Sequence, residues 1–280
     1  MPNEKVKMIV TDLDGTLFNA EGIISDTNLE TLRQLRDSGN ISVIATGRSL
    51  YSSLKSLPPD LPIDYLVCST GACIYNWKNH QILKSYNLNS SEVKQVYGLL
   101  MKLKLDFIIQ EAAPENHKCH YVKHSEENKD LENRNELYKT FSKKLDVNHF
   151  FPKESCQFIV IFDGNESVNC YDYIKNNLKN LKVIRTTSPL NHTSLWIEIY
   201  PSEVSKAKGI EFISTMHGIE INNIMTLGND YNDRDMLLLT KNAFVVNNAP
   251  EDLKKEFYTV SDHNQHGFSE AVEIFLTKPI

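Results

Sequence analysis

Residues 12–17 read Asp-Leu-Asp-Gly-Thr-Leu and directly follow Met-Ile-Val at residues 8–10. Side chains alternate along a strand, so Asp12 and Asp14 share a side only where the chain leaves the sheet at the carboxyl end of a strand. Open α/β sheets bind their ligands at that end. Two carboxylates so close together repel each other unless a cation or a shared proton relieves them. The stretch therefore predicts a ligand site at a strand end, with a hard metal ion, an acid and base pair, or both.

Strand and helix patterns alternate in the first and last parts of the chain. Short apolar runs predict strands at residues 6–11, 41–45, 65–68, 73–75, 224–227, 243–246 and 258–260. Ser25 is a typical N-cap for a helix that ends at Gly39 and carries apolar Leu29, Leu32 and Leu35. The alternation predicts an α/β fold with a Rossmann-like parallel-sheet core and right-handed crossovers.

The last part of this core begins with a helix after Ser205 that ends near Gly218. Its apolar face is expected to carry Ile210, Ile213 and Met216. Further helices are expected from Arg234, after Pro250 and over residues 268–276. We expect these elements to continue the sheet that the first strands begin.

Residues 85–200 differ from this pattern, because they are polar and rich in Asn and Lys. Helices are expected at 91–103, 131–145 and 167–178, and strands at 107–110, 157–162, 182–185 and 195–199. We interpret this segment as an inserted α+β cap domain. The core domain would then be discontinuous, with residues 1–84 and 201–280. Trp196 is expected to pack inside the cap.

The composition excludes several classes of function. A net charge of −6 over 280 residues offers no basic surface for a nucleic-acid duplex. The first residues run straight into a strand, so no signal peptide is expected, and no apolar run has the roughly 20 residues of a membrane helix. Five cysteines without a CxxC motif predict a reducing cytoplasm. The sequence leaves the oligomeric state open.

Polar residues follow the other expected strands and begin one helix. Thr46, Gly47 and Arg48 offer a hydroxyl, a flexible backbone and a forked cation, which suit an anionic oxygen. Lys206 lies at a helix N-terminus, where anions are favoured, with Lys208 as its rival for that role. Residues 228–233, Gly-Asn-Asp-Tyr-Asn-Asp, supply oxygen ligands for a hard cation.

These four sets, in this order, resemble the four motifs of the haloacid dehalogenase superfamily of phosphohydrolases, namely DxDGTL, TGR, Lys and GDxxND. The insertion between the second and third motifs resembles the cap of the Cof-type subfamily. Thr70-Gly71-Ala72 is similar to the Asn-Gly-Ala turn of that subfamily, and Asn248-Ala249 to its Asn-Ala turn. Thr70 and Asn248 also suit a purely turn-forming role.

The resemblance implies a role for each of the matched residues. Asp12 would attack phosphorus and form an aspartyl-phosphate, and Asp14 would act as general acid and then as general base. Thr46 and Lys206 would hold the phosphoryl oxygens. Mg²⁺ would bind the Asp12 carboxylate and the Asp14 backbone carbonyl. Substrate-binding roles are expected for the following residues: Gly47, Arg48, Asn232 and Asn248. Arg48 could equally form a surface salt bridge.

The fourth motif departs from the family pattern, since Asn229 stands where the family has a metal-binding Asp. An Asn carbonyl oxygen can ligate Mg²⁺ but brings no charge. We favour Asn229 as a direct metal ligand supported by Asp233, with Asp230 as the alternative ligand. The hypothesis predicts a weaker response to Mg²⁺ than an Asp at this position would give.

The leading functional prediction is a cytoplasmic, Mg²⁺-dependent phosphatase of small phosphorylated metabolites, with sugar phosphates as the favoured class. The core would carry the chemistry, and the cap would close over the site and select the substrate. A sugar phosphomutase is one alternative. A degenerate, non-catalytic protein that binds a phosphorylated ligand is another, favoured only by Asn229. His117, His120 and His124 also raise a zinc site in the cap as a further alternative.

Overall fold

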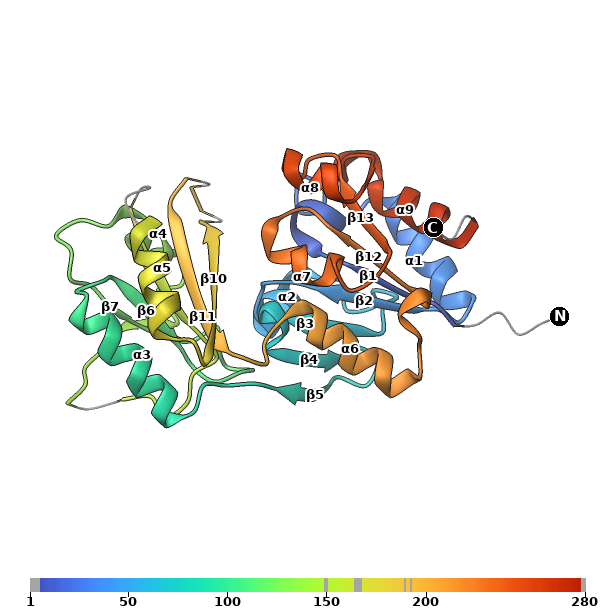
Figure 1. Cartoon of the computed structure of the whole chain (residues 1–280). Coiled ribbons are helices and arrows are strands. Elements are labelled where there is room, and N and C mark those ends of the chain that lie inside the picture. The colour runs from blue at the N-terminus through green and yellow to red at the C-terminus, as the bar shows by residue number, and fades with distance from the viewer. Residues whose placement is uncertain (1–5, 149–150, 164–167, 189, 192, 278–280) are drawn as a thin grey trace. The chain divides into compact units, whose positions relative to one another are not determined.

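The structure is a computed structural model that describes residues 6–148, 151–163, 168–188, 190–191 and 193–277. The chain divides into two compact units. The core unit consists of Met1–Lys84 and Ser205–Ile280, and the inserted unit consists of Ser85–Val204. Figure 1 labels most of the helices and strands of each unit. The fold is α/β, with a parallel-sheet core that the inserted α+β unit interrupts.

Within the described residues, the core unit holds one sheet of eight strands. Its order is β14 (Tyr258–Val260), β13 (Asn242–Val246), β12 (Ile224–Gly228), β1 (Met8–Thr11), β2 (Ile41–Ala45), β3 (Tyr65–Cys68), β4 (Cys73–Asn76) and β5 (Gln81–Ser85). The strands from β14 to β3 run parallel, whereas β4 returns antiparallel to β3. β1 lies in the middle, so the residues that follow it reach the centre of one sheet edge.

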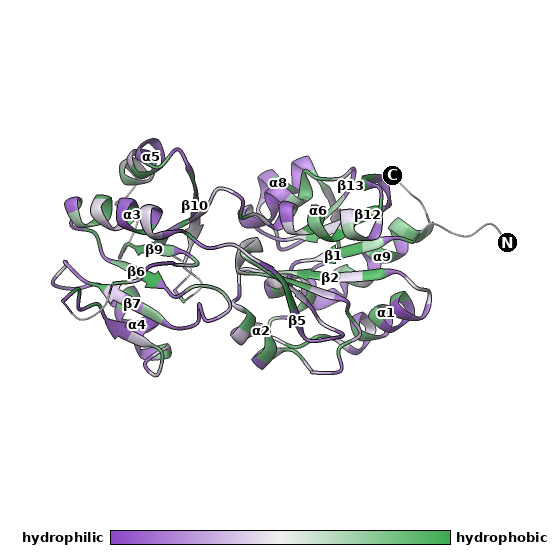
Figure 2. Cartoon of the chain, turned by 90° about the horizontal axis from the view of Figure 1, so that it is seen from below, coloured by the Kyte–Doolittle hydropathy of each residue, from purple (hydrophilic) through white to green (hydrophobic). Residues whose placement is uncertain are grey.

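Helices cover both faces of this sheet. They are α1 (Asp26–Asp37), α2 (Leu50–Ser56), α6 (Lys206–His217), α7 (Arg234–Leu237), α8 (Glu251–Glu256) and α9 (Gly267–Thr277). Figure 2 shows α1 and α6 on opposite faces, with the hydrophobic strands between them. The predicted N-cap is confirmed, since Ser25 accepts a hydrogen bond from the Asn28 amide. The helix predicted after Ser205 is confirmed as α6: Ser205 accepts a hydrogen bond from the Lys208 amide, and Gly218 ends the helix.

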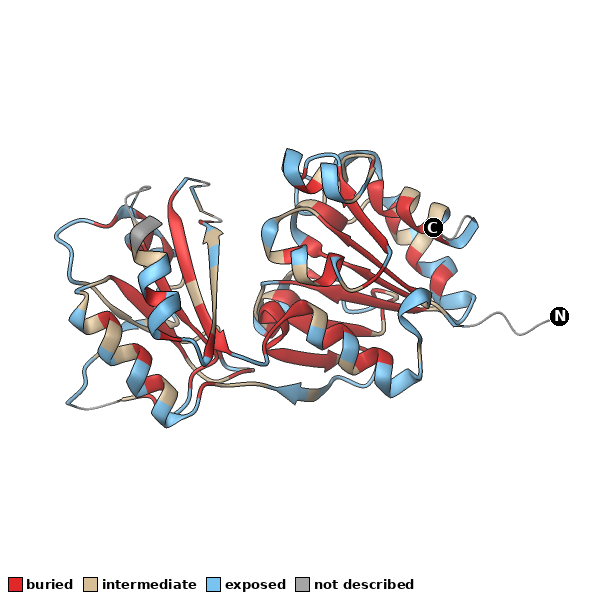
Figure 3. Ribbon diagram, in the orientation of Figure 1, coloured by how far each residue is buried: buried red, intermediate tan, exposed pale blue. Residues whose placement is uncertain are grey.

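The core packs on alternate residues of each strand. Met8 and Val10 of β1 pack with Ile210 and Ile213 of α6, whereas Ile9 faces the opposite side of the sheet. Figure 3 shows the central strands buried along their whole length, whereas β5 at the edge is largely exposed. Burial on both faces explains the near-continuous apolar runs by which the strands were predicted.

One predicted core residue of α6 is wrong. Met216 is 47% exposed, whereas Ser214 is buried. A spacing of six residues turns a helix about 120° away from its starting face, so Met216 leaves the face that Ile210 occupies. The stripe therefore continues through Ile213 and Ser214.

Within the described residues, six strands of the inserted unit form a second sheet. Its order is β10 (Leu181–Thr187), β11 (Leu195–Pro201), β9 (Phe158–Ile161), β6 (Phe107–Gln110), β7 (Cys119–Val122) and β8 (Ser142–Lys144). Its strands are antiparallel except for the β7–β8 pair. Its helices are α3 (Ser90–Lys102), α4 (Lys129–Leu137) and α5 (Val168–Asn177).

The predicted helix at residues 131–145 is wrong in its second half. α4 ends at Leu137, and a turn in which Tyr138 accepts the amides of Phe141 and Ser142 leads into β8. The backbone of β8 pairs with β7, so sheet hydrogen bonds replace the last helical turns. Trp196 is buried, as expected, and its Nε1 donates to Asp130 at 2.5 Å. The predicted start of the third helix, Ser167, lies outside the described residues.

None of the helices in the described part of the chain is long and apolar enough to cross a membrane.

Candidate active site

Asp12 is the first residue beyond β1, and it leaves the sheet at the carboxyl end of that strand. Its amide donates to the Leu227 carbonyl at 2.9 Å, which ties it to the end of β12. The helical turn η1 (Leu13–Leu17) follows, with Gly15 at φ +69°. The side chain of Asp12 is buried, and the Thr16 hydroxyl lies 3.3 Å from its Oδ2. The chain therefore holds one carboxylate in a fixed position at the sheet edge.

Lys206 meets two carboxylates at this point. Its Nζ lies 2.6 Å from Asp12 Oδ1 and 2.5 Å from Asp233 Oδ1. The Lys206 side chain has no exposed surface, whereas Lys208 is exposed. The structure therefore places Lys206, and not its rival, beside the predicted nucleophile. The three charges leave the buried cluster with one net negative charge.

The cluster changes the acidity of its members. Burial raises the pKa of Asp12 to about 7, with the charge of Asp233 adding to the rise and Lys206 opposing it. Burial alone would lower the pKa of Lys206, but the carboxylates of Asp12 and Asp233 outweigh burial and leave that pKa above the ordinary lysine value. Lys206 is therefore a permanent cation beside Asp12.

Asp233 organises the loop that follows β12. Its Oδ1 accepts from Lys206, and its Oδ2 accepts the backbone amides of Asn229 at 2.8 Å and Asp230 at 3.1 Å. A Cβ on Gly228 would lie 2.6 Å from the Cβ of Asp233, so only glycine allows this approach. Both oxygens of Asp233 thus contact groups of the protein itself.

The structure separates the two candidate metal ligands at 229 and 230. Asn229 lies beside the turn that follows Asp12, because a Cβ on Gly15 would come within 2.5 Å of Asn229 Nδ2. Asp230 instead accepts the Tyr231 amide at 2.7 Å, and burial raises the pKa of its carboxyl. Asn229 is therefore the one that contacts the Asp12 loop.

Thr46 and Arg48 lie in the loop that follows β2. The Arg48 amide donates to the Thr46 hydroxyl at 3.1 Å, and Thr46 is buried while Gly47 is exposed. The Arg48 guanidinium forms two hydrogen bonds with the Asp14 carboxylate, at 2.8 Å and 2.6 Å. It also donates to Ser56 Oγ at 2.9 Å. The structure thus pairs Arg48 with the predicted acid–base residue.

Asn248 and Asn232 occupy different surroundings. Asn248 donates through Nδ2 to the Gly15 carbonyl at 2.9 Å and accepts the His263 amide at 3.3 Å. Asn248 therefore joins the Asp12 loop to the C-terminal segment. A purely turn-forming role for Asn248 would not predict this long-range contact. Asn232 lies half-buried in η4 (Tyr231–Asp233), one residue before Asp233.

The three histidines that were considered as zinc ligands, His117, His120 and His124, have separate neighbours. His117 Nε2 lies 4.0 Å from Glu115, and His120 Nε2 lies 3.8 Å from Glu111. His124 Nδ1 contacts the carbonyl of Leu105 at 2.8 Å. Among the residues that the structure describes, no three His, Cys, Asp or Glu side chains are grouped so that they could hold a metal ion.

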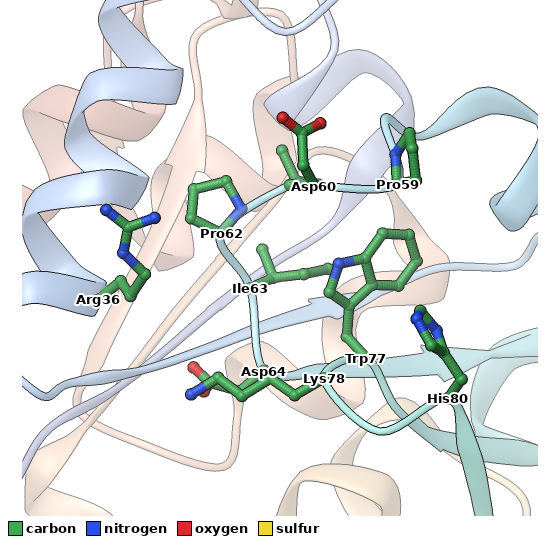
Figure 4. Close-up of a pocket in the computed structure, with 10 residues that line it drawn as sticks. Arg36, Pro59, Asp60, Pro62, Ile63, Asp64, Trp77, Lys78 and His80 are labelled. Atoms are coloured by element: carbon green, nitrogen blue, oxygen red, sulfur yellow. The ribbon is translucent and has the colours of Figure 1, made fainter.

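A separate pocket of about 220 Å³ lies at the amino ends of β2 and β3, away from Asp12. Figure 4 shows Trp77 and Ile63 at its centre, with Pro62 beside them. Asp64 in its wall is already bound, since it accepts the Ser42 amide and pairs with Lys78. None of the predicted site residues lines this pocket.

Solved structures of two phosphatases share the fold of this chain. The chain matches the phosphatase BT1666 from Bacteroides thetaiotaomicron with a TM-score of 0.80 at 19% identity, over 98% of this chain and 97% of that one. It matches the subclass IIB sugar phosphatase BT4131 with a TM-score of 0.76 at 20% identity, over 96% and 99%. Both matches show that the chain has the fold of these solved structures.

The sequence matches the same class over almost its whole length. The model of the haloacid dehalogenase-like hydrolases matches residues 9–272. The 5-amino-6-(5-phospho-D-ribitylamino)uracil phosphatase YwtE of Bacillus subtilis is 24% identical over 296 residues, with 97% of this chain and 99% of that protein covered. The chain belongs to the haloacid dehalogenase-like hydrolase family. It is a phosphoric monoester hydrolase that acts on phosphorylated substrates.

Proposed function

We propose that the protein hydrolyses small phosphorylated metabolites, with sugar phosphates as the substrate class, in a Mg²⁺-dependent reaction through a phosphorylated Asp12. The observation that carries this proposal is the buried Asp12 carboxylate at the end of β1, 2.6 Å from the Lys206 ammonium. Burial removes the carboxylate from water, and the fixed cation beside it stabilises charge on an incoming phosphoryl group.

The first step forms the covalent intermediate. A carboxylate oxygen of Asp12 attacks phosphorus, and the bond from phosphorus to the leaving oxygen breaks. Asp14 gives its proton to that oxygen, so the alcohol leaves neutral. Lys206 and the Thr46 hydroxyl hold the phosphoryl oxygens during the transfer. We assign Gly47, Arg48, Asn232 and Asn248 to the surroundings of the bound substrate, with Asn248 acting through the Gly15 carbonyl that it binds.

The second step releases phosphate. Water attacks phosphorus of the aspartyl-phosphate, and Asp14, now ionised, accepts the proton of that water. The bond between phosphorus and the Asp12 oxygen breaks, so inorganic phosphate leaves and the Asp12 carboxylate is restored. Asp14 ends protonated, as it began. In the structure two hydrogen bonds from Arg48 hold the Asp14 carboxylate, so Arg48 sets the position from which Asp14 acts.

The residues at the site fit a magnesium ion. In the described part of the chain, Asp12 Oδ2 receives a single hydrogen bond, the 3.3 Å contact from the Thr16 hydroxyl. The buried cluster of Asp12, Lys206 and Asp233 carries one uncompensated negative charge. We propose the Asp12 carboxylate, the Asp14 backbone carbonyl and the Asn229 amide oxygen as ligands. Asp233 would support Asn229 by accepting its backbone amide. These are all oxygen donors, which hard cations prefer. Bound Mg²⁺ would neutralise charge between the nucleophile and the phosphate.

The proposed substrate class rests on two named relatives. One acts on a phosphorylated ribityl compound and the other is a sugar phosphatase, so both act on phosphate esters of polyhydroxylated carbon chains. We assign catalysis to the core unit, Met1–Lys84 and Ser205–Ile280, and the selection of substrate to the inserted unit, Ser85–Val204. We place the protein in the cytoplasm, where the thiols of Cys68, Cys73, Cys119, Cys156 and Cys170 would stay reduced.

The test compares wild type with Asp12→Asn on a panel of phosphorylated metabolites in the presence of Mg²⁺. The wild type is expected to release inorganic phosphate and, after acid quench, to carry one phosphoryl group on the peptide that contains Asp12. The variant is expected to fold and to do neither. Turnover by Asp12→Asn would reject the mechanism. An isomeric monoester in place of free phosphate from a hexose 1-phosphate would identify a phosphomutase instead.

One observation favours a second candidate, a protein that binds a phosphorylated ligand without turnover. Asn229 lowers the number of carboxylates at the metal site, and a site without bound metal would bind substrate but transfer phosphate poorly. Tight binding of a panel member by calorimetry, with no phosphate released at high Mg²⁺, would establish this candidate.

A further inference from the structure

A tight turn joins β3 to β4 at the same edge of the sheet. The Ala72 amide donates to the Ser69 carbonyl at 3.0 Å, and the residues between them have positive φ, +58° for Thr70 and +107° for Gly71. Ser69 also has a positive φ, +49°, so three consecutive residues of this four-residue connection between Cys68 and Cys73 have a left-handed backbone. We call it the 69–72 turn.

Thr70 is an unusual residue for this position. Asn and Gly adopt the left-handed region readily, whereas a β-branched residue does so rarely and only where its surroundings hold it. Thr70 is 2% exposed. Its hydroxyl oxygen lies 3.9 Å from the position that a Cβ on Gly47 would take. The strained side chain is thus buried against the phosphate-binding loop of the second motif.

Backbone hydrogen bonds fix that loop to the turn. The Ser69 amide donates to the Arg48 carbonyl at 2.8 Å, and the Thr70 amide donates to the Thr46 carbonyl at 3.0 Å. The two accepting residues flank Gly47. Two consecutive amides of the turn therefore determine where the Thr46 hydroxyl lies.

The other side of the turn contacts the start of α6. A Cβ on Gly71 would lie 2.2 Å from the Ser205 carbonyl oxygen and 3.1 Å from the Ser205 nitrogen. Ser205 is the N-cap of α6, and Lys206 is the first residue of that helix. Contact this close requires glycine, so any side chain at position 71 would push the turn and the helix N-terminus apart.

We propose that the 69–72 turn sets the spacing between the Thr46 loop and Lys206, and that Thr70 and Gly71 are positioning residues for phosphoryl binding. The turn lies between the two groups that must contact different oxygens of one phosphoryl group, an inference that rests on the roles proposed above for Thr46 and Lys206. A shift of either group by a fraction of an ångström would weaken the binding of phosphate before it weakens the fold.

The first test compares Gly71→Ala with Gly218→Ala. Gly218 ends the same helix at φ +64°, and a Cβ there would meet nothing within 4 Å, so this control carries the backbone strain without the clash. Competitive inhibition by inorganic phosphate is measured together with thermal unfolding. We expect Gly71→Ala to raise the inhibition constant for phosphate about 100-fold, because the groups that bind phosphate are misplaced. Gly218→Ala is expected to leave this constant within about twofold of wild type.

The second test keeps the turn glycine. Thr70→Val preserves the β-branched shape and removes the hydroxyl that lies beside Gly47, whereas Thr70→Ser keeps the hydroxyl. We expect the valine variant to raise the phosphate inhibition constant about tenfold and the serine variant to restore it within about threefold. Thr226→Val makes the same change at another buried threonine of the core unit and is expected to leave the constant unchanged.

A double variant tests the route of the effect. If Thr70 acts by placing Thr46, Thr70→Val should cost much less in a Thr46→Ala background than in the wild type, because the group that it positions is already gone. Wild-type phosphate inhibition in both Gly71→Ala and Thr70→Val, or full additivity of Thr70→Val with Thr46→Ala, would overturn the inference. Wild-type activity in Asp12→Asn would instead overturn the proposed function, whatever the turn variants do.

Discussion

Lys206 donates to Asp12 across 2.6 Å at a point where the lysine side chain has no exposed surface and the aspartate almost none. Asp233 accepts from the same nitrogen at 2.5 Å. An ammonium group so deeply buried is tolerated because two carboxylates surround it, and each of these depends on the ammonium in turn. The lysine therefore has a part in folding as well as in phosphate binding.

Lys206→Met is expected to lower the free energy of unfolding by about 3–5 kcal/mol, because it leaves two facing buried carboxylates without a cation. Denaturant unfolding in the absence of substrate measures the loss. Adding Asp233→Asn should recover part of it, since that change removes one of the two charges. Lys208→Ala, at an exposed position of the same helix, is the control and should stay within about 0.5 kcal/mol of wild type. An equal loss in Lys208→Ala would contradict the prediction.

Asp12→Asn is expected to raise thermal stability at neutral and basic pH in the absence of metal. The pKa of Asp12 rises from 3.8 to about 7 in the folded protein. The folded state therefore keeps a proton that the unfolded chain loses, and stability falls as pH rises through this window. The asparagine variant carries no such cost. Its melting temperature should exceed that of wild type by at least about 3 °C near pH 8 and match it near pH 4.

Calorimetry over this pH range, with a chelator present, gives the measurement. Mg²⁺ should then raise the melting temperature of the wild type and not that of Asp12→Asn, because the variant lacks the carboxylate ligand. A stability difference that does not vary with pH would show that the burial of Asp12 is not its cause.

Asn229→Asp is expected to bind Mg²⁺ about tenfold more tightly than wild type, since a full negative charge replaces an amide oxygen beside the Asp12 loop. The shift of melting temperature with Mg²⁺ concentration measures this without relying on turnover. Asp230→Asn is the matched change at the neighbouring residue, whose carboxylate caps Tyr231. If the Asp230 variant alone changes the Mg²⁺ response, the ligand is Asp230 and our assignment of Asn229 is wrong.

The sequence could predict which loops form the site, because the order of the parallel strands brings these loops together. Asp12, Thr46 and residues 228–233 each follow a buried strand, and parallel strands bring their carboxyl ends to one edge. Apolar runs and helix caps are local signals, and they located most elements of the core unit. The same signals could not stop the predicted helix at Leu137, because the backbone pairing of β7 and β8 decides that boundary.

The hydrogen-bond partners of the site residues could not be predicted from local sequence patterns. Nothing near Asp233 in the sequence indicates that both its oxygens bind groups of the protein, since Lys206 lies far away along the chain. The same holds for Asn248, whose contact with the Gly15 carbonyl depends on how two distant loops pack. Strand order determines which loops meet, and side-chain packing then determines which atoms do.

Asn248→Ala is expected to lower activity through the loop that it supports and not through lost contact with substrate. The change frees the Gly15 carbonyl and the His263 amide, which Asn248 now joins. We expect kcat to fall about tenfold with KM nearly unchanged, because Asp12 and Asp14 lie directly before Gly15 and would be held less firmly. Asn247→Ala, one residue earlier, is the control. A rise in KM alone would indicate direct binding of substrate by Asn248.

The role of Asp14 as general acid can be tested by comparing substrates with different leaving groups. An alkoxide needs a proton as it leaves, whereas a nitrophenolate leaves without one, so removing the acid should matter only for the first. Asp14→Asn is therefore expected to lower kcat/KM for a sugar phosphate about 1000-fold and for an aryl phosphate only about tenfold. Equal losses on both substrates would assign Asp14 to binding or to the second step.

Arg48→Lys tests the pair that holds this acid. The lysine keeps the charge but cannot reproduce the two parallel hydrogen bonds to the Asp14 carboxylate. Both partners are partly exposed, so the free energy of unfolding should change by no more than about 1 kcal/mol. The rate should respond more strongly, with kcat/KM for the sugar phosphate about tenfold lower, because Asp14 starts from a less defined position.

In an Asp14→Asn background the same change should have little further effect, since the acid that Arg48 orients is already absent. Independent effects of the two changes would mean that Arg48 acts on the substrate and not through Asp14.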